Sequence, residues 1–364
     1  MQAVVLAGGR GQRLHPLTAR TPKPLVPVLG RPLLGHLLLH LHSRGVEEAF
    51  VTAGYMGAAI AEFVRSARLP LRVQVVQEGS VRGTAGAVAD LLPELRTPFL
   101  VVSGDSVLDL DLDALVAAHR AALADATICA APPAGRLRFG VIAAHGGRVD
   151  GFVEKPGLDE LLPGLVVSTG CYLLERAALA ESPAHGPVDF AQDVFPRLLH
   201  RGARLAVAPG LRYWRDIGTA EAYRDIHLEA ISGQWPWSAA PPGAPARLGA
   251  GAEVVGPAVF GQGVTIGPRA RLLGPVYVGD GASVGAGATV ARSVLLGGSR
   301  VGAHAEVVDA VLDAAVASGA AVSGAIVGST DWLPPRHVGR SATAPVGRLA
   351  AVPDRAPSRA PAHA

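Results

Sequence analysis

The chain has 364 residues, of which 49% are hydrophobic and 17% charged, and its formal net charge at pH 7 is +3. This length allows two domains with substantial cores, while the small charge and the lack of a dense lysine or arginine run give no indication of nucleic-acid binding. No apolar run approaches the ~20 residues of a membrane span, and the N-terminal one is too short for a signal peptide, so no membrane association is expected. Two widely separated cysteines, Cys129 and Cys171, lie in apolar stretches and predict free thiols in the reducing cytoplasm.

Residues 1–231 alternate short apolar stretches with amphipathic ones. Strand patterns cover residues 3–6, 49–53, 72–77, 99–103, 126–130, 139–144, 166–174 and 204–208, and helical patterns cover residues 32–44, 56–66, 85–92, 112–123 and 191–201. This alternation predicts an α/β domain with a mostly parallel, Rossmann-like sheet. Residues 232–250 contain Trp235-Pro236-Trp237 and a run of prolines that break both patterns, which predicts a linker between two domains.

A glycine-rich turn follows the first predicted strand directly. It reads Leu6-Ala7-Gly8-Gly9-Arg10-Gly11, and Arg13 and Lys23 come shortly after it. Glycines allow a backbone to approach a nucleotide closely, and two cations a short loop apart can bracket a polyphosphate. The spacing fits neither the dinucleotide-binding G-x-G-x-x-G motif nor the P-loop. The turn is therefore predicted to be a nucleotide site of another kind, suited to cleaving a phosphoanhydride.

A six-residue repeat follows the linker and occupies residues 251–330. Apolar residues recur every six positions from Val254 to Leu296, and the phase slips near Ser299. This spacing indicates a hexapeptide β-helix, in which the glycines after the apolar position are expected at corners with positive φ. Because such a coil cannot cover its own ends, a homo-oligomer formed through the β-helix is expected. Residues 331–364, rich in Pro, Ala and Arg, are predicted to be a disordered tail.

The run from Leu6 to Val26, with its Pro22-Lys23-Pro24 element, resembles the signature of the sugar-1-phosphate nucleotidylyltransferases. The resemblance covers residues 1–330 and is greatest to the mannose-1-phosphate guanylyltransferases. It implies a GT-A-like catalytic domain followed by a left-handed parallel β-helix. It also implies attack of a sugar 1-phosphate oxygen on the α-phosphorus of a nucleoside triphosphate, with pyrophosphate leaving. Arg13 and Lys23 would then be catalytic, because they would stabilise the charge that develops on the phosphates.

Two aspartates are candidates for binding Mg²⁺. Asp105 ends an apolar strand pattern, which is the position where α/β sheets place ligands. Asp216, within Trp214-Arg215-Asp216-Ile217-Gly218, resembles the second metal-binding aspartate of the family. Carboxylate oxygens suit Mg²⁺, which also binds water and phosphate oxygens. A turn role for Asp105 and a capping role for Asp216 are the alternatives.

Contacts to the sugar 1-phosphate are inferred from the same resemblance. Lys155, in Glu154-Lys155-Pro156, is similar to the family lysine that binds the phosphate, and Glu154 would accept hydrogen bonds from sugar hydroxyls. A surface ion pair is the alternative for these two residues. The remaining sugar contacts correspond to Gly140, Thr169 and Gly170. The family's Asn-Ala-Gly element reads Ser-Thr-Gly at residues 168–170, which leaves the identity of the sugar open.

Nucleotide binding is expected from two segments, which contribute Leu6, Ala7, Gly8 and Gly9, and Glu78, Gly83 and Thr84. The element Gly-Thr-Ala-Gly at residues 83–86 resembles that of mannose-1-phosphate guanylyltransferases, whereas thymidylyltransferases usually carry a Leu-Ala-Gln variant. Glu78 aligns with a base-contacting residue, and a carboxylate complements the two adjacent donors of guanine. GTP is therefore the expected nucleotide.

Three other functions are compatible with these patterns. One is a transferase specific for dTTP or another nucleotide, acting on glucose 1-phosphate. Another is a regulatory homologue without catalysis, although such a protein would be expected to have lost a residue of the catalytic set. A third is an acyltransferase in the β-helix, although such a site needs a general base and the repeat contains a single histidine, His304, with no lysine beside it. His36 and His40, one turn apart on an apolar helix, are expected to pack rather than to bind a metal.

Overall fold

The computed structural model describes residues 1–132, 140–154, 165–208, 211, 213–237, 243–324 and 326–328. The chain forms two compact units, one made of Met1–Leu14 and Thr18–Pro242 and the other of His15–Leu17 and Gly243–Ala364. None of the helices in the described ranges is long and apolar enough to cross a membrane.

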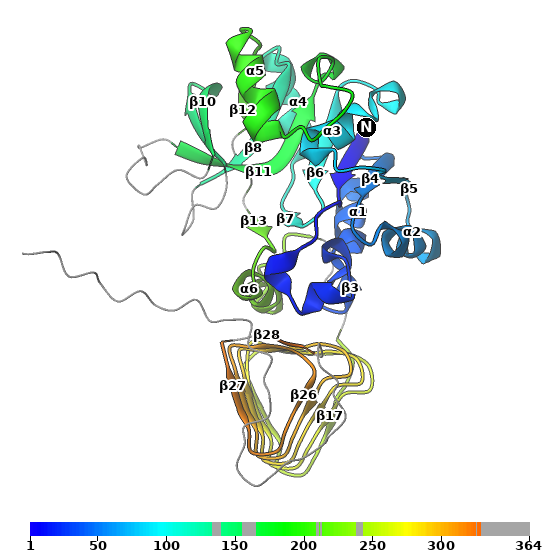
Figure 1. Cartoon of the computed structure of the whole chain (residues 1–364). Coiled ribbons are helices and arrows are strands. Elements are labelled where there is room, and N and C mark those ends of the chain that lie inside the picture. Colours follow the sequence, from blue (N-terminus) through cyan, green and yellow to red (C-terminus); the bar gives the residue numbers. More distant parts are fainter. Residues whose placement is uncertain are drawn as a thin grey trace, which may run out of the picture. The chain divides into compact units, whose positions relative to one another are not determined.

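A nine-stranded sheet forms the centre of the first unit (Figure 1). In spatial order its strands are β5 (Arg72–Gln77), β4 (Glu48–Ala53), β1 (Gln2–Leu6), β6 (Phe99–Ser103), β11 (Leu165–Leu174), β8 (Ala126–Ala131), β12 (Leu205–Ala208), β10 (Arg148–Glu154) and β9 (Gly140–His145). Strands β5, β4, β1 and β6 pair in parallel, as do β8 and β12. Strand β11 pairs antiparallel with β6, β8 and β9, and β10 pairs antiparallel with β9 and β12. The predicted Rossmann-like sheet is thus present, with parallel strands in its N-terminal half and antiparallel strands around β11.

Helices flank this sheet and supply its core. They are α1 (Leu33–Ser43), α2 (Gly57–Ser66), α3 (Gly83–Ala89), α4 (Leu112–Ala121), α5 (Phe195–His200) and α6 (Ala220–Ile231), with a π-helical turn at Phe190–Val194 before α5 and short 3₁₀ turns at Gln12–Leu14, Leu17–Ala19, Lys23–Leu25, Leu92–Glu94 and Arg176–Ala178. Phe99, Tyr172, Phe190 and Phe195 meet in the main core. Burial of each aromatic side chain removes apolar surface from water, which stabilises the folded state by about 25 cal/mol per Å².

Helix α6 has no counterpart among the helices expected from the sequence. Its start is nevertheless marked, because the Thr219 hydroxyl accepts a hydrogen bond from the Ala222 amide at 3.2 Å. Tyr223, Ile226 and Ala230 form its buried face, at the spacing of three and four residues that one face of a helix requires.

Two short antiparallel pairs complete the first unit. One joins β2 (Pro27–Val28) to β3 (Arg31–Pro32), and the other joins β7 (Ser106–Leu108) to β13 (Trp214–Asp216). The second pair places the segment after β6 beside a segment more than a hundred residues later in the chain.

The second unit is a left-handed parallel β-helix with three sheets, seen end-on as a triangle in Figure 1. The first sheet contains β14 (Arg247–Leu248), β17 (Thr265–Ile266), β20 (Ser283–Val284), β23 (Arg300–Val301) and β26 (Ala315–Val316). The second contains β15 (Glu253–Val255), β18 (Arg271–Leu273), β21 (Thr289–Ala291), β24 (Glu306–Val308) and β27 (Ala321–Ser323). The third contains β16 (Ala258–Phe260), β19 (Val276–Val278), β22 (Val294–Leu295), β25 (Val311–Asp313) and β28 (Ile326–Gly328).

The register of the β-helix follows the sequence repeat. Glu253 pairs with Arg271 and Arg271 with Thr289, so one coil contains three hexapeptides. Thr289 pairs with Glu306 and Glu306 with Ala321, so the later coils are shorter, which matches the phase slip near Ser299.

The repeat glycines serve a different purpose from the one expected. Positive φ occurs at Gly263, Gly281 and Gly287, not at the glycines that directly follow the apolar positions. At Gly267 an added Cβ would lie 2.6 Å from the amide nitrogen of Ala286 in the next coil. Stacked coils approach too closely there for a side chain, so the expectation of positive φ at these positions was wrong.

The boundary between the two units lies inside the predicted linker 232–250. Trp237 is buried in the first unit, where its ring stacks on that of His40 at 5.5 Å, and its indole nitrogen donates to the Leu108 carbonyl at 2.7 Å. Residues 247–248 already form the first strand of the β-helix. The connecting segment is therefore shorter than the sequence suggested. The predicted tail, residues 331–364, lies outside the described residues.

Candidate active site

The ends of the parallel strands β1 and β6 form the floor of the site. Leu6 is opposite Ser103, and the Gly104 amide donates to the Leu6 carbonyl at 2.8 Å. An added Cβ at Gly104 would lie 2.8 Å from the same carbonyl oxygen, so only glycine fits. Asp105 follows immediately, and the Ser103 hydroxyl lies 2.5 Å from its Oδ1. The glycine and serine thereby fix the carboxylate at the edge of the sheet.

Asp216 reaches the same place through the β7–β13 pair. Asp216 is opposite Ser106, and the Ile217 amide donates to the Asp105 carbonyl at 3.1 Å. The backbone hydrogen bonds of this pair thus bring the two predicted metal-binding residues together.

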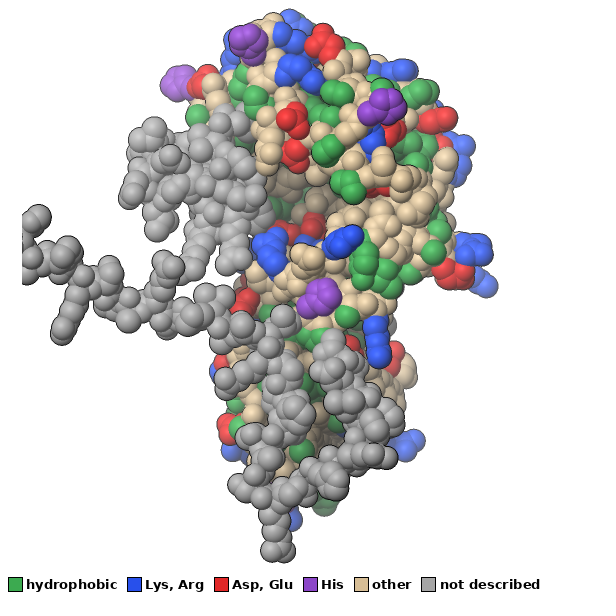
Figure 2. Space-filling view, in the orientation of Figure 1, with side chains coloured by type: hydrophobic (Ala, Val, Ile, Leu, Met, Phe, Trp, Pro, Cys, Tyr) green, Lys and Arg blue, Asp and Glu red, His purple; other side chains and the backbone are tan. Residues whose placement is uncertain are grey.

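Lys23 lies between these two carboxylates. It is the first residue of the 3₁₀ turn Lys23–Leu25, which follows Pro22 and contains Pro24, and only 8% of its surface is exposed. Its Nζ donates to Asp105 Oδ2 in a short ion pair and lies 3.4 Å from Asp216 Oδ1. In the space-filling view, basic and acidic side chains meet in a recess of the first unit (Figure 2).

Arg13 approaches the cluster from its solvent side. Its Nη2 lies 4.0 Å from Asp216 Oδ2, and 55% of its side chain is exposed. An added Cβ at Gly218 would lie 2.5 Å from Asp216 Oδ2 and 3.0 Å from Arg13 Nη2, so glycine leaves room for both side chains. The exposed Arg13 guanidinium is therefore accessible to the phosphate group of a ligand that binds at this cluster.

The two carboxylates differ in proton affinity. Burial opposes ionisation of Asp105, but the Lys23 ammonium and hydrogen bonds from Lys23 and Ser103 outweigh it and lower the pKa of Asp105. Burial and the neighbouring Asp105 charge raise the pKa of Asp216, and Lys23 and Arg13 offset this only in part. Burial lowers the pKa of Lys23, yet the two carboxylates raise it overall, so the lysine stays charged.

This donor set fits a hard divalent cation. Two part-buried carboxylates, Asp105 and Asp216, lie on either side of one ammonium, so their oxygens are close enough together to serve one cation. No cluster of three or more His, Cys, Asp or Glu side chains suitable for a metal occurs within the described ranges. The protein therefore offers two oxygen ligands, which suits Mg²⁺ because it keeps water and phosphate oxygens as further ligands.

Glu78 lies across the glycine turn from this cluster. It follows β5, and its amide donates to the Ala53 carbonyl at 2.9 Å. Its carboxylate packs on Gly8, where an added Cβ would lie 2.5 Å from Glu78 Oε1. Burial raises the pKa of Glu78, and the hydrogen bond from the backbone of Arg82 acts in the opposite direction. Gly8 thus provides space for a partly desolvated carboxylate beside the turn.

Gly83 and Thr84, predicted to bind the nucleotide, have structural contacts. An added Cβ at Gly83, which has φ of +71°, would lie 2.5 Å from the Val188 carbonyl oxygen. The Thr84 hydroxyl donates to Asp189 Oδ2 at 2.8 Å and accepts from the Phe190 amide at 3.1 Å. Both residues attach the loop to the segment that precedes the π-helical turn, and Asp189 was not identified from the sequence.

The residues expected to contact the sugar lie on adjacent strands. Gly140 and Glu154 are direct partners in the β9–β10 pair, and β9 also pairs with β11, which contains Thr169 and Gly170. Lys155 lies outside the described residues. The structure thus gathers Gly140, Glu154, Thr169 and Gly170 in one part of the sheet.

The hydroxyl and the carbonyl of Thr169 are both hydrogen-bonded inside the protein. It is 3% exposed, and its hydroxyl donates to the Cys129 carbonyl at 2.7 Å. Its own carbonyl accepts from the Trp214 indole at 3.2 Å. Trp214 and Ser103 were missed as site residues, although both stand inside the motifs that contain Asp216 and Asp105. Trp214 connects strand β13, which contains the predicted metal ligand Asp216, to the strand of the expected sugar contacts.

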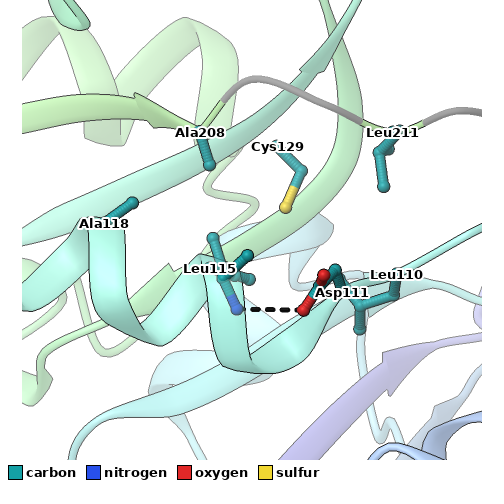
Figure 3. Close-up of a pocket in the computed structure, with 8 residues that line it drawn as sticks. Leu110, Asp111, Leu115, Ala118, Cys129, Ala208 and Leu211 are labelled. Carbon is teal, nitrogen blue, oxygen red and sulfur yellow. Dashed lines mark hydrogen bonds between the residues drawn. The ribbon is translucent and has the colours of Figure 1, made fainter.

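A separate cavity of about 210 Å³ lies between α4 and the ends of β8 and β12 (Figure 3). Its lining is mostly aliphatic, and the sulfur of Cys129 points into it. The Asp111 carboxylate at its edge caps α4 by accepting from the Ala114 amide at 3.0 Å. None of the predicted site residues is among its described lining residues, and the cavity has no part in the chemistry developed below.

Comparison with known families agrees with this geometry. Residues 2–233 match the nucleotidyl transferase family, and residues 257–292 match the bacterial transferase hexapeptide repeats. The chain therefore belongs to the nucleotidyl transferase family and carries a hexapeptide-repeat domain.

Similar proteins within this family carry several names. A mannose-1-phosphate guanylyltransferase of Mycobacterium tuberculosis is 34% identical over 65% of this chain and 66% of its own length, so the chain spans just under two thirds of that relative. Mannose-1-phosphate guanylyltransferase 1 of Arabidopsis thaliana is 29% identical over 84% of both chains. A UTP--glucose-1-phosphate uridylyltransferase of Synechocystis is 28% identical over 85% of this chain and 86% of its own. HddC from Yersinia pseudotuberculosis shares the fold, with a TM-score of 0.54 and 24% identity over 62% of this chain and 96% of that chain.

Proposed function

We propose that the protein transfers a guanylyl group from GTP to mannose 1-phosphate and releases pyrophosphate, in a Mg²⁺-dependent reaction in the cytoplasm. The observation that carries this proposal is the cluster in which the buried Lys23 lies between the part-buried Asp105 and Asp216, with Arg13 at its edge. A homologue without catalysis would have no need to hold two part-buried carboxylates side by side, because like charges at close range repel each other. The names of the mycobacterial and plant relatives support the choice of substrates.

The reaction joins a sugar 1-phosphate oxygen to the α-phosphorus of the nucleotide and breaks the bond to the β-phosphate. No covalent bond to the protein is needed, so the chain has to align two polyanions and balance their charge. The Lys23 ammonium and the Arg13 guanidinium would stabilise the charge on the α-phosphoryl group and the leaving pyrophosphate. Asp105 and Asp216 would hold Mg²⁺, which supplies Lewis-acid stabilisation of the phosphate oxygens.

The proposed preference for guanine rests on Glu78. Guanine offers two adjacent donors, N1–H and the N2 amine, and a carboxylate accepts both, whereas thymine and uracil offer one donor between two acceptors. The sugar would lie over the strands that contain Gly140, Glu154 and Thr169, with Lys155 on its phosphate.

A uridylyl or thymidylyl transferase acting on glucose 1-phosphate is the second candidate. The similarity to the Synechocystis uridylyltransferase favours it. Pyrophosphate release measured over a matrix of GTP, UTP, dTTP and ATP with mannose and glucose 1-phosphate separates the two. We expect the highest kcat/KM for GTP with mannose 1-phosphate. A maximum with UTP or dTTP and glucose 1-phosphate would establish the second candidate instead.

We also propose that the β-helix forms a homo-oligomer. Leu248, Val254 and Val255 on its first strands are 55%, 38% and 56% exposed, and an uncovered coil end favours association. A chain that ends at Pro242 should therefore contain fewer subunits per oligomer than the full chain, as measured by light scattering. An unchanged oligomeric state would place the interface in the first unit.

A further inference from the structure

The side chain of Lys23 uses the carboxylate oxygens that a metal ion at this cluster would need. Its ammonium pairs with Asp105 Oδ2 and lies 3.4 Å from Asp216 Oδ1. The second oxygen of Asp105, Oδ1, lies 2.5 Å from the Ser103 hydroxyl, and the second oxygen of Asp216, Oδ2, lies 4.0 Å from Arg13 Nη2. All four carboxylate oxygens therefore face a donor that belongs to the protein itself.

Packing of the lysine stem holds the ammonium in this place. Lys23 is 8% exposed, and a Cβ added to Gly11 would lie 3.0 Å from Lys23 Cβ and 3.4 Å from Lys23 Cδ. Gly11 has φ of +63°, and its carbonyl accepts a hydrogen bond from the Thr18 hydroxyl at 2.8 Å. The glycine turn that is predicted to bind the nucleotide thus also supports the lysine that contacts both carboxylates.

A metal ion and the ammonium would repel each other at this cluster. A divalent ion that binds both carboxylates would lie close to the ammonium, because Nζ is itself within 3.4 Å of an oxygen of each. Like charges repel more strongly at a partly buried site than in bulk water, because the effective dielectric constant is lower there. Lys23 and a divalent cation therefore compete for the same pair of carboxylates.

The phosphates of a bound nucleotide would relieve this competition. In the proposed reaction the Lys23 ammonium stabilises phosphate oxygens, and its flexible four-carbon stem allows the ammonium to exchange a carboxylate partner for a phosphate partner. Phosphates also supply negative charge for two cations at one place, and Mg²⁺ is commonly held by one or two carboxylates together with substrate phosphates. Metal and nucleotide should then each strengthen the binding of the other, since such coupling is reciprocal.

We infer that Lys23 keeps the affinity of the Asp105–Asp216 pair for a divalent cation low until a nucleotide binds. The inference rests on the proposed role of these two aspartates as metal ligands. It gives Lys23 a second role beside its contact to the phosphates, and the two roles have opposite signs. Loss of the lysine should strengthen metal binding while it slows the reaction.

The test measures the binding of Mn²⁺ to the full-length protein without nucleotide, by electron paramagnetic resonance of the free ion. Mn²⁺ prefers the same oxygen ligands as Mg²⁺. Lys23→Met removes the charge and keeps an unbranched apolar stem, whereas Lys23→Arg keeps a cation. Arg13→Met is the matched control, because it also removes one positive charge, from a side chain that is 55% exposed and lies 4.0 Å from Asp216.

For Lys23→Met we expect Mn²⁺ to bind at least about 10-fold more tightly than to the wild type, because the competing cation is gone. Lys23→Arg should stay within about 3-fold of the wild type, since its charge is kept. Arg13→Met should gain less than about 3-fold, because solvent and salt screen an exposed charge. Addition of Asp216→Asn to Lys23→Met should abolish the gain. The kcat of Lys23→Met should fall even at saturating Mg²⁺.

Thermal unfolding gives a second measurement of the same competition. Without a divalent cation, Lys23→Met leaves two carboxylates side by side and should have a lower Tm than the wild type. Mn²⁺ should raise the Tm of Lys23→Met more than that of the wild type, because an ion stabilises the folded state according to its affinity. If Lys23→Met does not fold without a cation, Lys23→Gln, which keeps a hydrogen-bond donor without the charge, is measured in its place.

Equal Mn²⁺ affinity in the wild type and in Lys23→Met, or weaker binding in Lys23→Met, would overturn the inference and leave the metal site in place. An equal gain in Arg13→Met would overturn it too, since net charge rather than Lys23 would then set the affinity. If neither the wild type nor any variant binds Mn²⁺, the role of Asp105 and Asp216 as metal ligands fails, and the inference fails with it. The measurement contains no nucleotide, so a preference for a nucleotide other than GTP does not affect its result.

Discussion

The two units differ in where their charged side chains lie. In the first unit, the buried Lys23 is brought together with the part-buried carboxylates of Asp105 and Asp216. In the described part of the β-helix, ion pairs such as Arg271–Glu253 and Arg292–Asp309 stand on the surface, and the interior is aliphatic. Buried charges cost free energy, whereas exposed pairs contribute about 0 to 1 kcal/mol. The charged side chains that are partly or fully buried in the first unit therefore need close partners, which Lys23, Asp105 and Asp216 supply to one another.

The units also differ in how their parts meet. Each coil of the β-helix pairs with the next one along the chain, so its contacts repeat at a short and regular separation. The charge cluster instead joins residues 23, 105 and 216, and the base loop joins residues 78–86 to 183–189. A change in the β-helix should therefore act on stability, and a change in the cluster should act on catalysis.

The largest expected effect is on the paired carboxylates. Asp105→Asn and Asp216→Asn should each lower kcat at least ~100-fold, because the Mg²⁺ that we propose for this site would lose a ligand and Lys23 would lose a charged partner. Circular dichroism should show an unchanged fold. Asp113→Asn, at an exposed site in the first turn of α4, is the control and should keep the wild-type rate. A wild-type rate in either test variant would remove that residue from the site.

The next effect is on the acid stability of the first unit. Burial lowers the pKa of His36 and of His40 to about 4, whereas an unfolded histidine titrates at its ordinary value of 6.5. Between these values the unfolded chain binds more protons than the folded chain. The free energy of unfolding should thus be at its full value above pH 6.5 and fall as the pH decreases toward 4, by roughly 3 kcal/mol for each histidine.

Denaturant unfolding followed by the fluorescence of Trp235 and Trp237, whose rings lie beside these histidines, measures this loss. His40→Gln should flatten the dependence on pH. The same substitution at His304, an exposed residue of the β-helix, should leave it unchanged. Equal slopes in the wild type and in His40→Gln would show that His40 does not titrate in this way.

A smaller and more selective effect is expected at the base site. Glu78→Gln keeps the size of the side chain but replaces two acceptors by one acceptor and one donor, and should weaken kcat/KM for GTP by ~1 to 3 kcal/mol. Use of dTTP should fall less or rise, since its single imide donor still finds the amide oxygen. Steady-state kinetics with both nucleotides measure the ratio. A ratio equal to that of the wild type contradicts the role given to Glu78.

In the β-helix, a substitution should lower stability and leave nucleotide binding unchanged. Gly267→Ala would place a Cβ 2.6 Å from the Ala286 amide nitrogen and should lower the free energy of unfolding of the β-helix by about 1 to 3 kcal/mol. Gly297→Ala is the matched control, because its Cβ would lie at an ordinary 3.4 Å from the Asp280 carbonyl. Neither change should alter the KM for GTP. A change in KM for either variant would show that the two units are coupled.

Much of this protein is determined by local sequence. The apolar strands, the glycine turn and the six-residue repeat specify an α/β unit and a β-helix, because strand and coil formation depend on residues close together in the chain. The family resemblance also named Lys23, Asp105 and Asp216, since each stands in a motif. Helix α6 was not predicted, because its N-cap was not recognised in the sequence. The role of the repeat glycines was not predicted either, because the distance between coils is a property of the stacked strands.

Only the tertiary structure decided which of these residues meet. No pattern places Lys23 between two carboxylates more than a hundred residues apart; the β7–β13 pair does that through backbone hydrogen bonds. No motif shows that Thr84 holds Asp189, or that Arg82 is buried against Pro183 and Asp90. Such contacts depend on how segments that are far apart in the sequence pack together, and no short stretch of sequence specifies that packing. The sequence by itself therefore determined the chemistry available to this protein, and the packing of distant segments decided where that chemistry is assembled.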